Sequence, residues 1–391
     1  MPTVQSPTQD LTGGPPVPDA VLDVVRTHAS DVDRAARFPA EAIAALRELG
    51  LLAAPIPTDL GGSGASLTRL AAITRALGAE CASTAMIYAM HQTQLLSLTR
   101  HGLSSPAIAA FVERVATEGL LLASATTEIG IGGDVRSSSC AVTYEGSQFT
   151  LSKNAPVISY GAYADAILVT ARRSPESNQG DQVLVLCPSD RLELEQTGAW
   201  DTLGFRGTCS PGFLLKAQGS ADWVLPVPYS TISARSMLPT AHVLWAAAWS
   251  GIADAAVAKA RKAVRQQARR NPGTTPPAAL RLAELSVIHD RLVDTVRSAA
   301  ADFDDNADNP ARLDSIGFAI HANNVKVTAS ELVVEIVGRA MVICGIAGYR
   351  DDSDLSIGRH LRDAHGSQIM VSNERILAHN AQLGLIYKGD R

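Results

Sequence analysis

The chain has 391 residues, of which 46% are apolar and 19% are charged, and its formal net charge is -5 at pH 7. This composition is typical of a folded globular protein with enough chain for two or three domains, so it excludes a disordered or fibrous protein. The acidic balance gives no support for nucleic-acid binding. No apolar run reaches the ~20 residues that a membrane-spanning helix needs, so we expect no membrane contact.

The five cysteines lack the close spacing of a zinc site or a redox motif, and their odd number argues against a disulfide framework. Scattered cysteines of this kind favour a reducing compartment. Residues 1–17 are polar, are rich in proline and glycine, and lack the basic and apolar regions of a secretory signal. We therefore expect a cytoplasmic protein with no metal site, which begins with a disordered arm over residues 1–17.

Residues 18–120 have the pattern of a helical domain. The stretch "FPAEAIAALRELGLL" spaces Ile43, Leu46 and Leu49 three residues apart, as one face of a helix requires. Gly50 follows where a C-cap is expected. After a glycine-rich turn, Ser66 has the position of an N-cap for the next helix.

Residues 121–232 change to short β-branched or alternating runs separated by Gly, Asn, Ser and Pro. The run "TYEGSQFTLS" predicts a hairpin around Glu145-Gly146-Ser147. We expect a compact antiparallel β domain in this middle region.

Residues 233–391 return to long amphipathic helices, the last of them through "LRDAHGSQIMVSNERILAHNAQLGLIY". Long helices joined by short connections predict an antiparallel four-helix bundle. The predicted fold class is therefore α+β, with helices, a β domain and a helical bundle in that order.

The segment "TTEIGIGGD", from Thr126 to Asp134, packs three glycines between two acidic residues. A dinucleotide-binding motif would need a strand before the glycines and a helix after them, but "DVRSSSCAVTYEG" predicts a strand. A P-loop would need a Gly-Lys-Ser/Thr ending, which is absent. From these residues alone, a surface turn and the edge of a cofactor site both remain open.

The order of the motifs resembles the acyl-CoA dehydrogenase family over roughly 350 residues. "TEIGIGGD" is similar to the segment that opens the family's β domain. "LSKNAPVISYGAYADAILVTA" resembles the strand pair that follows, and "LGFRGTCSPGFLL" resembles its Gly-x-Arg-x-Ser/Thr loop. "ICGIAGYRDDSDLSIGRHLRD" resembles its glycine turn and the Arg-Asp pair before the last helix.

The resemblance implies a flavoprotein of three domains that forms homo-oligomers. It implies FAD as the cofactor, with FMN or a reduced flavin supplied by a partner as alternatives. Backbone N–H groups and the Thr127 hydroxyl would bind the pyrimidine edge of the flavin ring, and Ser159 would lie beside N5. The glycine turn near residue 345 would reach the FAD of a neighbouring subunit. The cofactor contacts that the resemblance implies are Thr126, Thr127, Gly132, Gly133, Ile158, Ser159, Arg269, Gly345 and Ile346.

The sequence departs from the family at its catalytic base. The family's glutamate falls on Val371, and the alternative position on the long helix falls on Ala241. Neither side chain accepts a proton. The catalytic candidates that remain are Glu374, nearly one helical turn past Val371, and His242, beside Ala241. Glu374 could instead be a solvent-exposed charge at the start of a helix. His242 could instead be a structural residue in the wall of the active site.

Three functions remain open. The first is a flavin oxidoreductase acting on an acyl thioester, carried by CoA or by an acyl carrier protein, with an electron-transfer protein as acceptor. The second is a flavin-dependent monooxygenase of the same fold, which takes another small molecule as substrate and needs a flavin reductase but no glutamate. The third is a descendant without redox activity that uses the acyl pocket, because several of the family's flavin contacts are altered, among them Val157 and Pro272.

Overall fold

The computed structural model describes residues 15–130 and 135–389. The predicted order of helices, β domain and helical bundle is confirmed. Among the described residues, none of the helices combines the length and the apolar character needed to cross a bilayer. Of the residues predicted to form a disordered arm, 1–14 lie outside the described part of the chain.

The N-terminal helices enclose one helix that is buried almost all round. They are α1 (Asp19–Ala35), α2 (Ala40–Glu48), α3 (Leu67–Glu80), α4 (Ala82–His101) and α5 (Pro106–Glu118). The two predicted helix signals hold: Gly50 has a left-handed φ of 67° after α2, and the Ser66 side chain accepts a hydrogen bond from the Arg69 N–H. The buried helix is α4, which packs against both β1 and α7.

The middle region forms two small sheets. The strands are β1 (Leu122–Ala125), β2 (Thr143–Glu145), β3 (Gln148–Ala155), β4 (Ala166–Arg172), β5 (Gln182–Pro188), β6 (Leu192–Gln196) and β7 (Phe213–Ser220). The sheets have the orders β1-β4-β5 and β2-β3-β7-β6. The predicted hairpin is present between β2 and β3, where Gly146 has a φ of 61°. All strand pairs are antiparallel except β1 with β4, which a pattern of local residues could not reveal.

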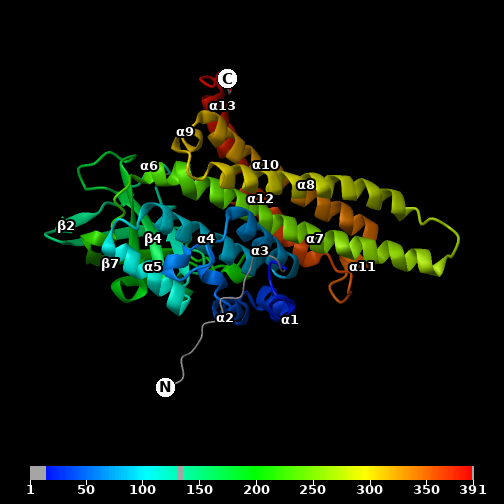
Figure 1. Ribbon diagram of the computed structural model, residues 1–391. Coiled ribbons are helices and arrows are strands. Elements are labelled where there is room, and N and C mark those ends of the chain that lie inside the picture. The colour runs from blue at the N-terminus through cyan, green and yellow to red at the C-terminus, as the bar shows by residue number, and fades with distance from the viewer. Residues whose placement is uncertain (1–14, 131–134, 390–391) are drawn as a thin grey trace.

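The C-terminal bundle is built on three long helices. They are α7 (Leu238–Arg270), α8 (Ala278–Asn306) and α10 (Ile316–Cys344), and the shorter helices of this region are α6 (Tyr229–Ile232), α9 (Pro310–Leu313), α11 (Ile346–Tyr349), α12 (Gly358–Ile369) and α13 (Asn373–Gly384). Figure 1 shows α7 and α8 as a hairpin that extends from beside the β domain to a tip beyond the other helices. The last predicted helix is divided in two, into α12 and α13.

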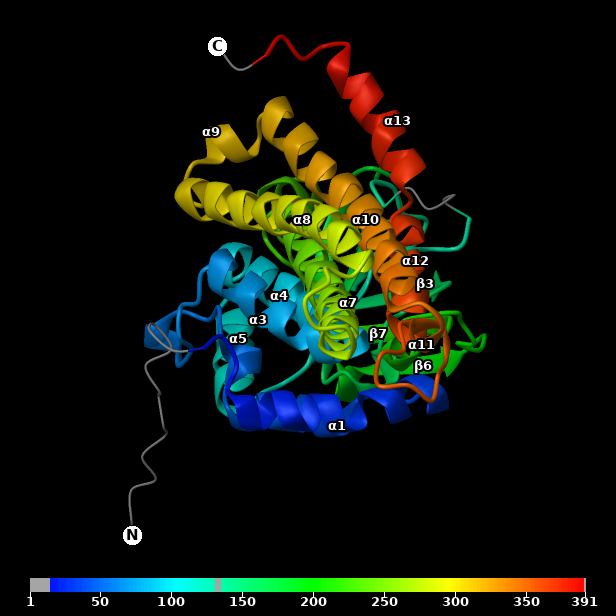
Figure 2. The ribbon, with the colours of Figure 1, turned by 90° about the vertical axis from the view of Figure 1, so that its right-hand side faces the viewer.

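The three regions share one hydrophobic core. At its centre α3 crosses α7, and two glycines let the backbones meet. A Cβ on Gly251 would lie 2.2 Å from the Arg75 carbonyl oxygen, and one on Gly78 would lie 2.5 Å from that of Ala248. Figure 2 shows α3 and α4 beside α7, with α8 and α10 above it. This packing fixes the N-terminal helices relative to the bundle.

Candidate functional site

The first wall of the candidate site is the β-domain lip, which we define as residues 126–128 and 157–159. Thr126 and Thr127 directly follow β1, and Val157 to Ser159 follow β3. The two segments lie side by side, since the Thr127 hydroxyl donates to the Val157 carbonyl oxygen at 3.5 Å. The predicted cofactor contacts Thr126, Thr127, Ile158 and Ser159 are thus brought together. Gly132 and Gly133 lie outside the described residues.

The buried carboxylate of Glu128 anchors the β-domain lip. Glu128 is 7% exposed and accepts hydrogen bonds from the Ser138 hydroxyl at 2.8 Å and the Ser139 and Cys140 N–H groups at 3.0 and 2.8 Å. The ammonium of Lys153, itself buried, is 3.8 Å from one of its oxygens. Glu128, the glutamate of the "TTEIG" segment, therefore stabilises the backbone conformation of the lip.

Ser159 has an unused hydroxyl proton. The Thr208 and Ser210 hydroxyls are 2.9 Å apart, and Ser210 donates to the Ser159 oxygen at 2.9 Å. No described acceptor takes the proton of Ser159 itself. The backbone N–H groups of Thr126, Thr127 and Ser159 likewise donate no hydrogen bond within residues 15–130 and 135–389.

These free donors provide a test of whether the lip fits a flavin. The pyrimidine edge of an isoalloxazine ring is rich in hydrogen-bond acceptors, so it is matched by a row of backbone N–H groups and a hydroxyl. Polar groups left without partners at a part-buried edge also require water or a ligand. The β-domain lip therefore fits a flavin ring edge.

The second part of the candidate site is the α12–α13 turn, which we define as residues 370–373 and which the family resemblance assigns to the site through Val371. Val371 has a φ of 49°, a conformation that β-branched residues rarely adopt. The ammonium of Lys326, on α10, donates to the Val371 carbonyl at 2.8 Å and to the Asn373 side-chain oxygen at 2.7 Å. Asn373 in turn donates to the Ser330 hydroxyl at 3.0 Å. These contacts explain the break in the last predicted helix.

The segment after the lip contacts the helical bundle at Arg136. The Arg136 guanidinium, six residues after Gly130, is 3.0 Å from His379 Nδ1 on α13. The segment that leaves the lip therefore lies against α13, the helix that begins in the α12–α13 turn. The Val371 side chain is 43% exposed there, whereas the Lys326 side chain is fully buried.

The two catalytic candidates have different surroundings. Glu374 is exposed in the first turn of α13 and makes no hydrogen bond to the described residues. His242 is buried on α7, and its Nδ1 lies 3.1 Å from the Ala322 carbonyl oxygen, so Nδ1 carries the proton. Burial, together with the charge of nearby Lys326, lowers the pKa of His242 to about 4, so it is neutral at physiological pH.

Arg269, Gly345 and Ile346 are not brought to the lip. Arg269 is exposed in the last turn of α7, at the tip of the α7–α8 hairpin (Figure 1). Gly345 and Ile346 lie between α10 and α11, and Ile346 is 75% exposed. Within one chain these three residues are placed at the end of the bundle away from the β domain.

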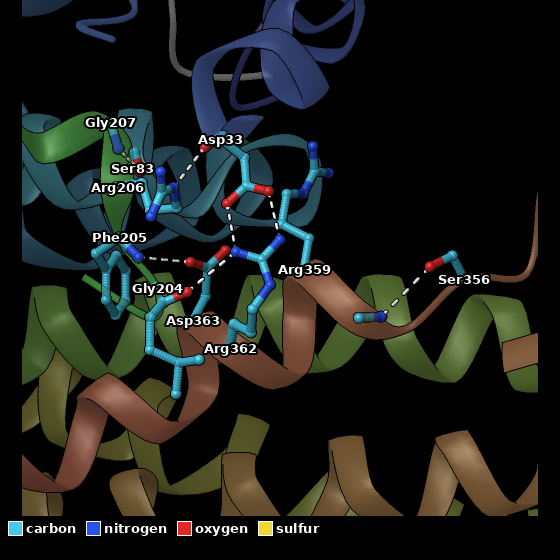
Figure 3. Close-up of polar contacts among 12 residues, drawn as sticks. Asp33, Ser83, Gly204, Phe205, Arg206, Gly207, Ser356, Arg359, Arg362 and Asp363 are labelled. Atoms are coloured by element: carbon cyan, nitrogen blue, oxygen red, sulfur yellow. Dashed lines mark hydrogen bonds and ion pairs between the residues drawn. The ribbon is translucent and has the colours of Figure 1, made fainter. Parts of the chain in front are cut away.

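The Arg-Asp pair of α12 connects the domains (Figure 3). Arg362 makes a bidentate ion pair with Asp33 of α1 and donates to the Leu203 carbonyl. The Asp363 carboxylate accepts from the Phe205 N–H at 2.7 Å, and burial raises its pKa to about 6. These contacts hold the loop that leads to Thr208 and Ser210, and thus support the hydroxyl chain that ends at Ser159.

Lys326 and Asn373 were not predicted from the sequence. Lys326 is separated from Val371 by 45 positions, so no local pattern connects them. The available signal was the helical spacing of Lys326 with Ala322, Ala329 and Val333, because a lysine on the apolar face of a helix is either functional or specifically paired.

Comparison with known families gives two matches. Residues 17–106 match the family "Acyl-CoA dehydrogenase, N-terminal domain", and residues 233–378 match "Acyl-CoA dehydrogenase, C-terminal domain". Among characterised sequences, the chain is 27% identical over 365 residues to the probable acyl-CoA dehydrogenase YngJ of Bacillus subtilis, covering 89% of this chain and 90% of that one.

Two solved structures share the fold. FMN-bound TdsC from Paenibacillus sp. A11-2, a dibenzothiophene monooxygenase, has a TM-score of 0.82 at 20% identity and covers 95% of this chain and 98% of its own. Butyryl-CoA dehydrogenase from Megasphaera elsdenii has a TM-score of 0.80 at 20% identity and covers 94% and 97%. At these identities the likeness establishes the fold alone.

Proposed function

The chain belongs to the acyl-CoA dehydrogenase family, and we propose that it is a flavin-dependent oxidoreductase that acts on an acyl thioester. One observation carries the proposal. In the β-domain lip the N–H groups of Thr126, Thr127 and Ser159 and the Ser159 hydroxyl have no acceptor among the described residues, on a segment that the buried Glu128 holds in place. Free donors of this kind match the acceptors of a flavin ring edge.

The chain's own residues have distinct roles in this proposal. A bound flavin supplies the acceptor for a hydride. Thr126 and Thr127 bind the ring edge through their N–H groups, and Ser159 donates its free proton beside them. Glu374 is the only carboxylate between residues 364 and 384, and we assign it the removal of the substrate's α-proton. His242 is buried and neutral, so it serves as part of the wall rather than as a base.

The finer identity of the cofactor belongs to this proposal. We propose FAD, with the adenosine half reaching Arg269, Gly345 and Ile346 of a second copy of the chain, because these residues lie away from the lip in one copy. Exposed apolar side chains support a homo-oligomer: Ile346 is 75% exposed, Tyr349 75% and Ile369 79%. The acyl carrier, CoA or a carrier protein, and the electron-transfer partner are part of the same proposal.

A second candidate is a flavin-dependent monooxygenase fed by a flavin reductase. The specific observation in its favour is the α12–α13 turn, where an apolar valine occupies the position of the family's base while Glu374 is exposed. A reaction of reduced flavin with oxygen needs no carboxylate there. TdsC, with which the chain shares its fold, is a monooxygenase.

The test begins with the purified full-length protein and titrations of FAD and FMN, oxidised and reduced, followed by absorbance and fluorescence. The proposal predicts tight FAD binding and anaerobic bleaching of the flavin by a thioester, tested with acyl-CoA and acyl-carrier-protein series. Oxygenation of substrate only when reduced flavin and oxygen are supplied supports the second candidate. Absence of affinity for flavin in either redox state would contradict both and favour the descendant without redox activity.

A further inference from the structure

Lys326 is a buried cation whose partners are neutral. Its side chain has no exposed area, and its ammonium contacts the Val371 carbonyl, the Asn373 amide oxygen and, at 5.8 Å, the ring of Trp249. Within the described residues no carboxylate lies in ion-pair distance. Burial of an ammonium without a counter-ion costs stability, so a compensating role in the structure is expected.

The carbonyl that Lys326 holds belongs to the most unusual backbone position of the bundle. Val371 is at a φ of 49°, where a β-branched side chain is strained. Lys326 draws its carbonyl inward, while the valine side chain remains 43% exposed. Backbone strain of this kind persists only where surrounding contacts enforce it.

The contacts around Lys326 extend to three elements. Asn373 is bound by Lys326 and Ser330 of α10, and the Ser367 hydroxyl of α12 donates to the Ser330 carbonyl at 3.0 Å. α10, α12 and the start of α13 are therefore joined at one point. Glu374 is the next residue after Asn373, so the direction of its backbone is set by this network.

We propose that Lys326 is a positioning residue, which through Val371 and Asn373 fixes the α12–α13 turn and thereby the orientation of Glu374 toward the acyl site. This inference rests on the proposed function for the role of Glu374. The fixing of the turn itself does not depend on any activity. The side chain of Lys326 touches neither lip nor solvent, so it acts through the turn rather than on a substrate.

The charge of Lys326 is open to titration, because burial lowers its pKa to about 8. Above that pH the amine is neutral and its hydrogen bonds to the turn weaken. The titratable groups on the packed elements include His242, Asp254 and Lys259 on α7, Glu374 and His379 on α13, and His360, Asp363 and His365 on α12. His360 is buried, and burial lowers its pKa. His242 is neutral at this pH, Glu374 and His365 are exposed, and Asp363 is turned to Phe205.

The experiment measures amide hydrogen exchange of residues 370–376 in the full-length protein, with and without FAD, at pH 7 and pH 9. We expect Lys326→Met to lower the protection of the turn about tenfold to hundredfold at pH 7, as the loss of hydrogen bonds from a charged donor implies. Wild-type protection, corrected for intrinsic exchange, should fall between pH 7 and 9. In Asn373→Asp the new carboxylate should raise the pKa of Lys326 and move that fall to higher pH.

The matched control is Lys259→Met. Lys259 is a half-buried lysine on α7, also with a pKa lowered to about 8, which donates to the Ser356 carbonyl at 2.6 Å. It should leave the exchange of residues 370–376 unchanged. Unchanged protection in Lys326→Met, or an equal loss in Lys259→Met, overturns the proposal.

The proposed effect of Lys326 on Glu374 is tested separately, through the pH dependence of kcat. If the protein reduces flavin with a thioester, the alkaline limb of kcat should lie near pH 8 in wild type and shift upward in Asn373→Asp, with KM nearly constant. An alkaline limb that stays in place in Asn373→Asp contradicts the link from Lys326 to Glu374. A protein without thioester activity would refute the proposed function alone, because the exchange measurement still decides whether Lys326 fixes the turn.

Discussion

The β domain and the helical bundle each bury one lysine beside the candidate site, and the two differ in their partners. Lys153 lies 3.8 Å from the Glu128 carboxylate and donates to the Thr170 carbonyl at 2.7 Å. Lys326 has only neutral oxygens and an aromatic ring. The first lysine balances a charge that supports a regular strand end, while the second holds a strained turn.

This difference suggests separate roles for the two regions, with cofactor binding at the β-domain lip and catalysis at the α12–α13 turn. The β-domain lip keeps the Thr127-Glu128 pair that resembles the family's motif, with Glu128 buried, although Val157 departs from the family, and its free donors fit a cofactor edge. The α12–α13 turn has Val371 where the family resemblance expects a carboxylate, and its unusual backbone shape is held by Lys326 on α10. Cofactor binding should therefore depend mainly on the lip, and the type of reaction on the turn.

The largest expected effect is on the turn. Glu374→Gln removes the only carboxylate between residues 364 and 384 and should reduce the rate of flavin reduction by a thioester about 100-fold or more, as loss of a general base does. Flavin affinity should remain. Single-turnover stopped-flow at 450 nm, roughly the flavin absorbance maximum, measures this rate. The exposed Glu331→Gln on α10 is the control. An unaltered rate in Glu374→Gln would rule out Glu374 as the base.

The next effect is on the lip. Glu128→Gln should lower the free energy of unfolding by about 3 kcal/mol, because Lys153 then stays buried without its carboxylate. Urea denaturation measures the loss. The double variant Glu128→Gln/Lys153→Met should recover part of it, whereas the exposed Glu193→Gln should be neutral. If the double variant is no more stable than the single one, the charge balance at the lip is not what supports it.

The fold was predictable because its signals are local. Gly50, Ser66 and the Glu145-Gly146-Ser147 turn each act within a few residues, and the structure has a helix end, an N-cap and a hairpin at those places. The break at Val371 was not predictable, because valine rarely adopts a positive φ and its cause lies in Lys326 on another helix. The parallel pairing of β1 with β4 also depends on contacts between distant segments.

The candidate site divides in the same way. Thr126, Thr127 and Ser159 were predicted as cofactor contacts from one motif and its neighbouring strand, and the structure places the two segments side by side. Their contact with a cofactor stays a prediction. The role of Glu128 as a buried anchor depends on Ser138 to Cys140 and Lys153, which the motif does not contain. The family resemblance predicted Arg269 and Gly345 as contacts of the same cofactor as the lip. Within one chain they lie at the end of α7 and after α10, away from the lip.

A smaller effect is expected at Asp363, where α12 contacts the β domain. Burial raises the pKa of Asp363 to about 6 in the folded state, above its ordinary value of 3.8. Between these values the folded state binds more protons than the unfolded state, so this group lowers stability as the pH rises from about 4 to about 6. Asp363→Asn has no such dependence and can still accept from the Phe205 N–H. Relative to wild type, it should gain about 2–3 kcal/mol across that range in urea denaturation.

The smallest effect is expected at His242, where the sign is opposite. Its folded pKa of about 4 lies below the ordinary 6.5, so the unfolded state binds the proton first. The contribution of His242 to stability is complete above pH 6.5 and is lost as the pH falls toward 4. His242→Asn should therefore remove a modest part of the acid sensitivity and leave flavin reduction between pH 6 and 8 within about threefold. A rate profile that loses an inflection near the ordinary histidine pKa in this variant would instead make His242 a working acid or base, and the bundle wall would then carry chemistry of its own beyond the α12–α13 turn.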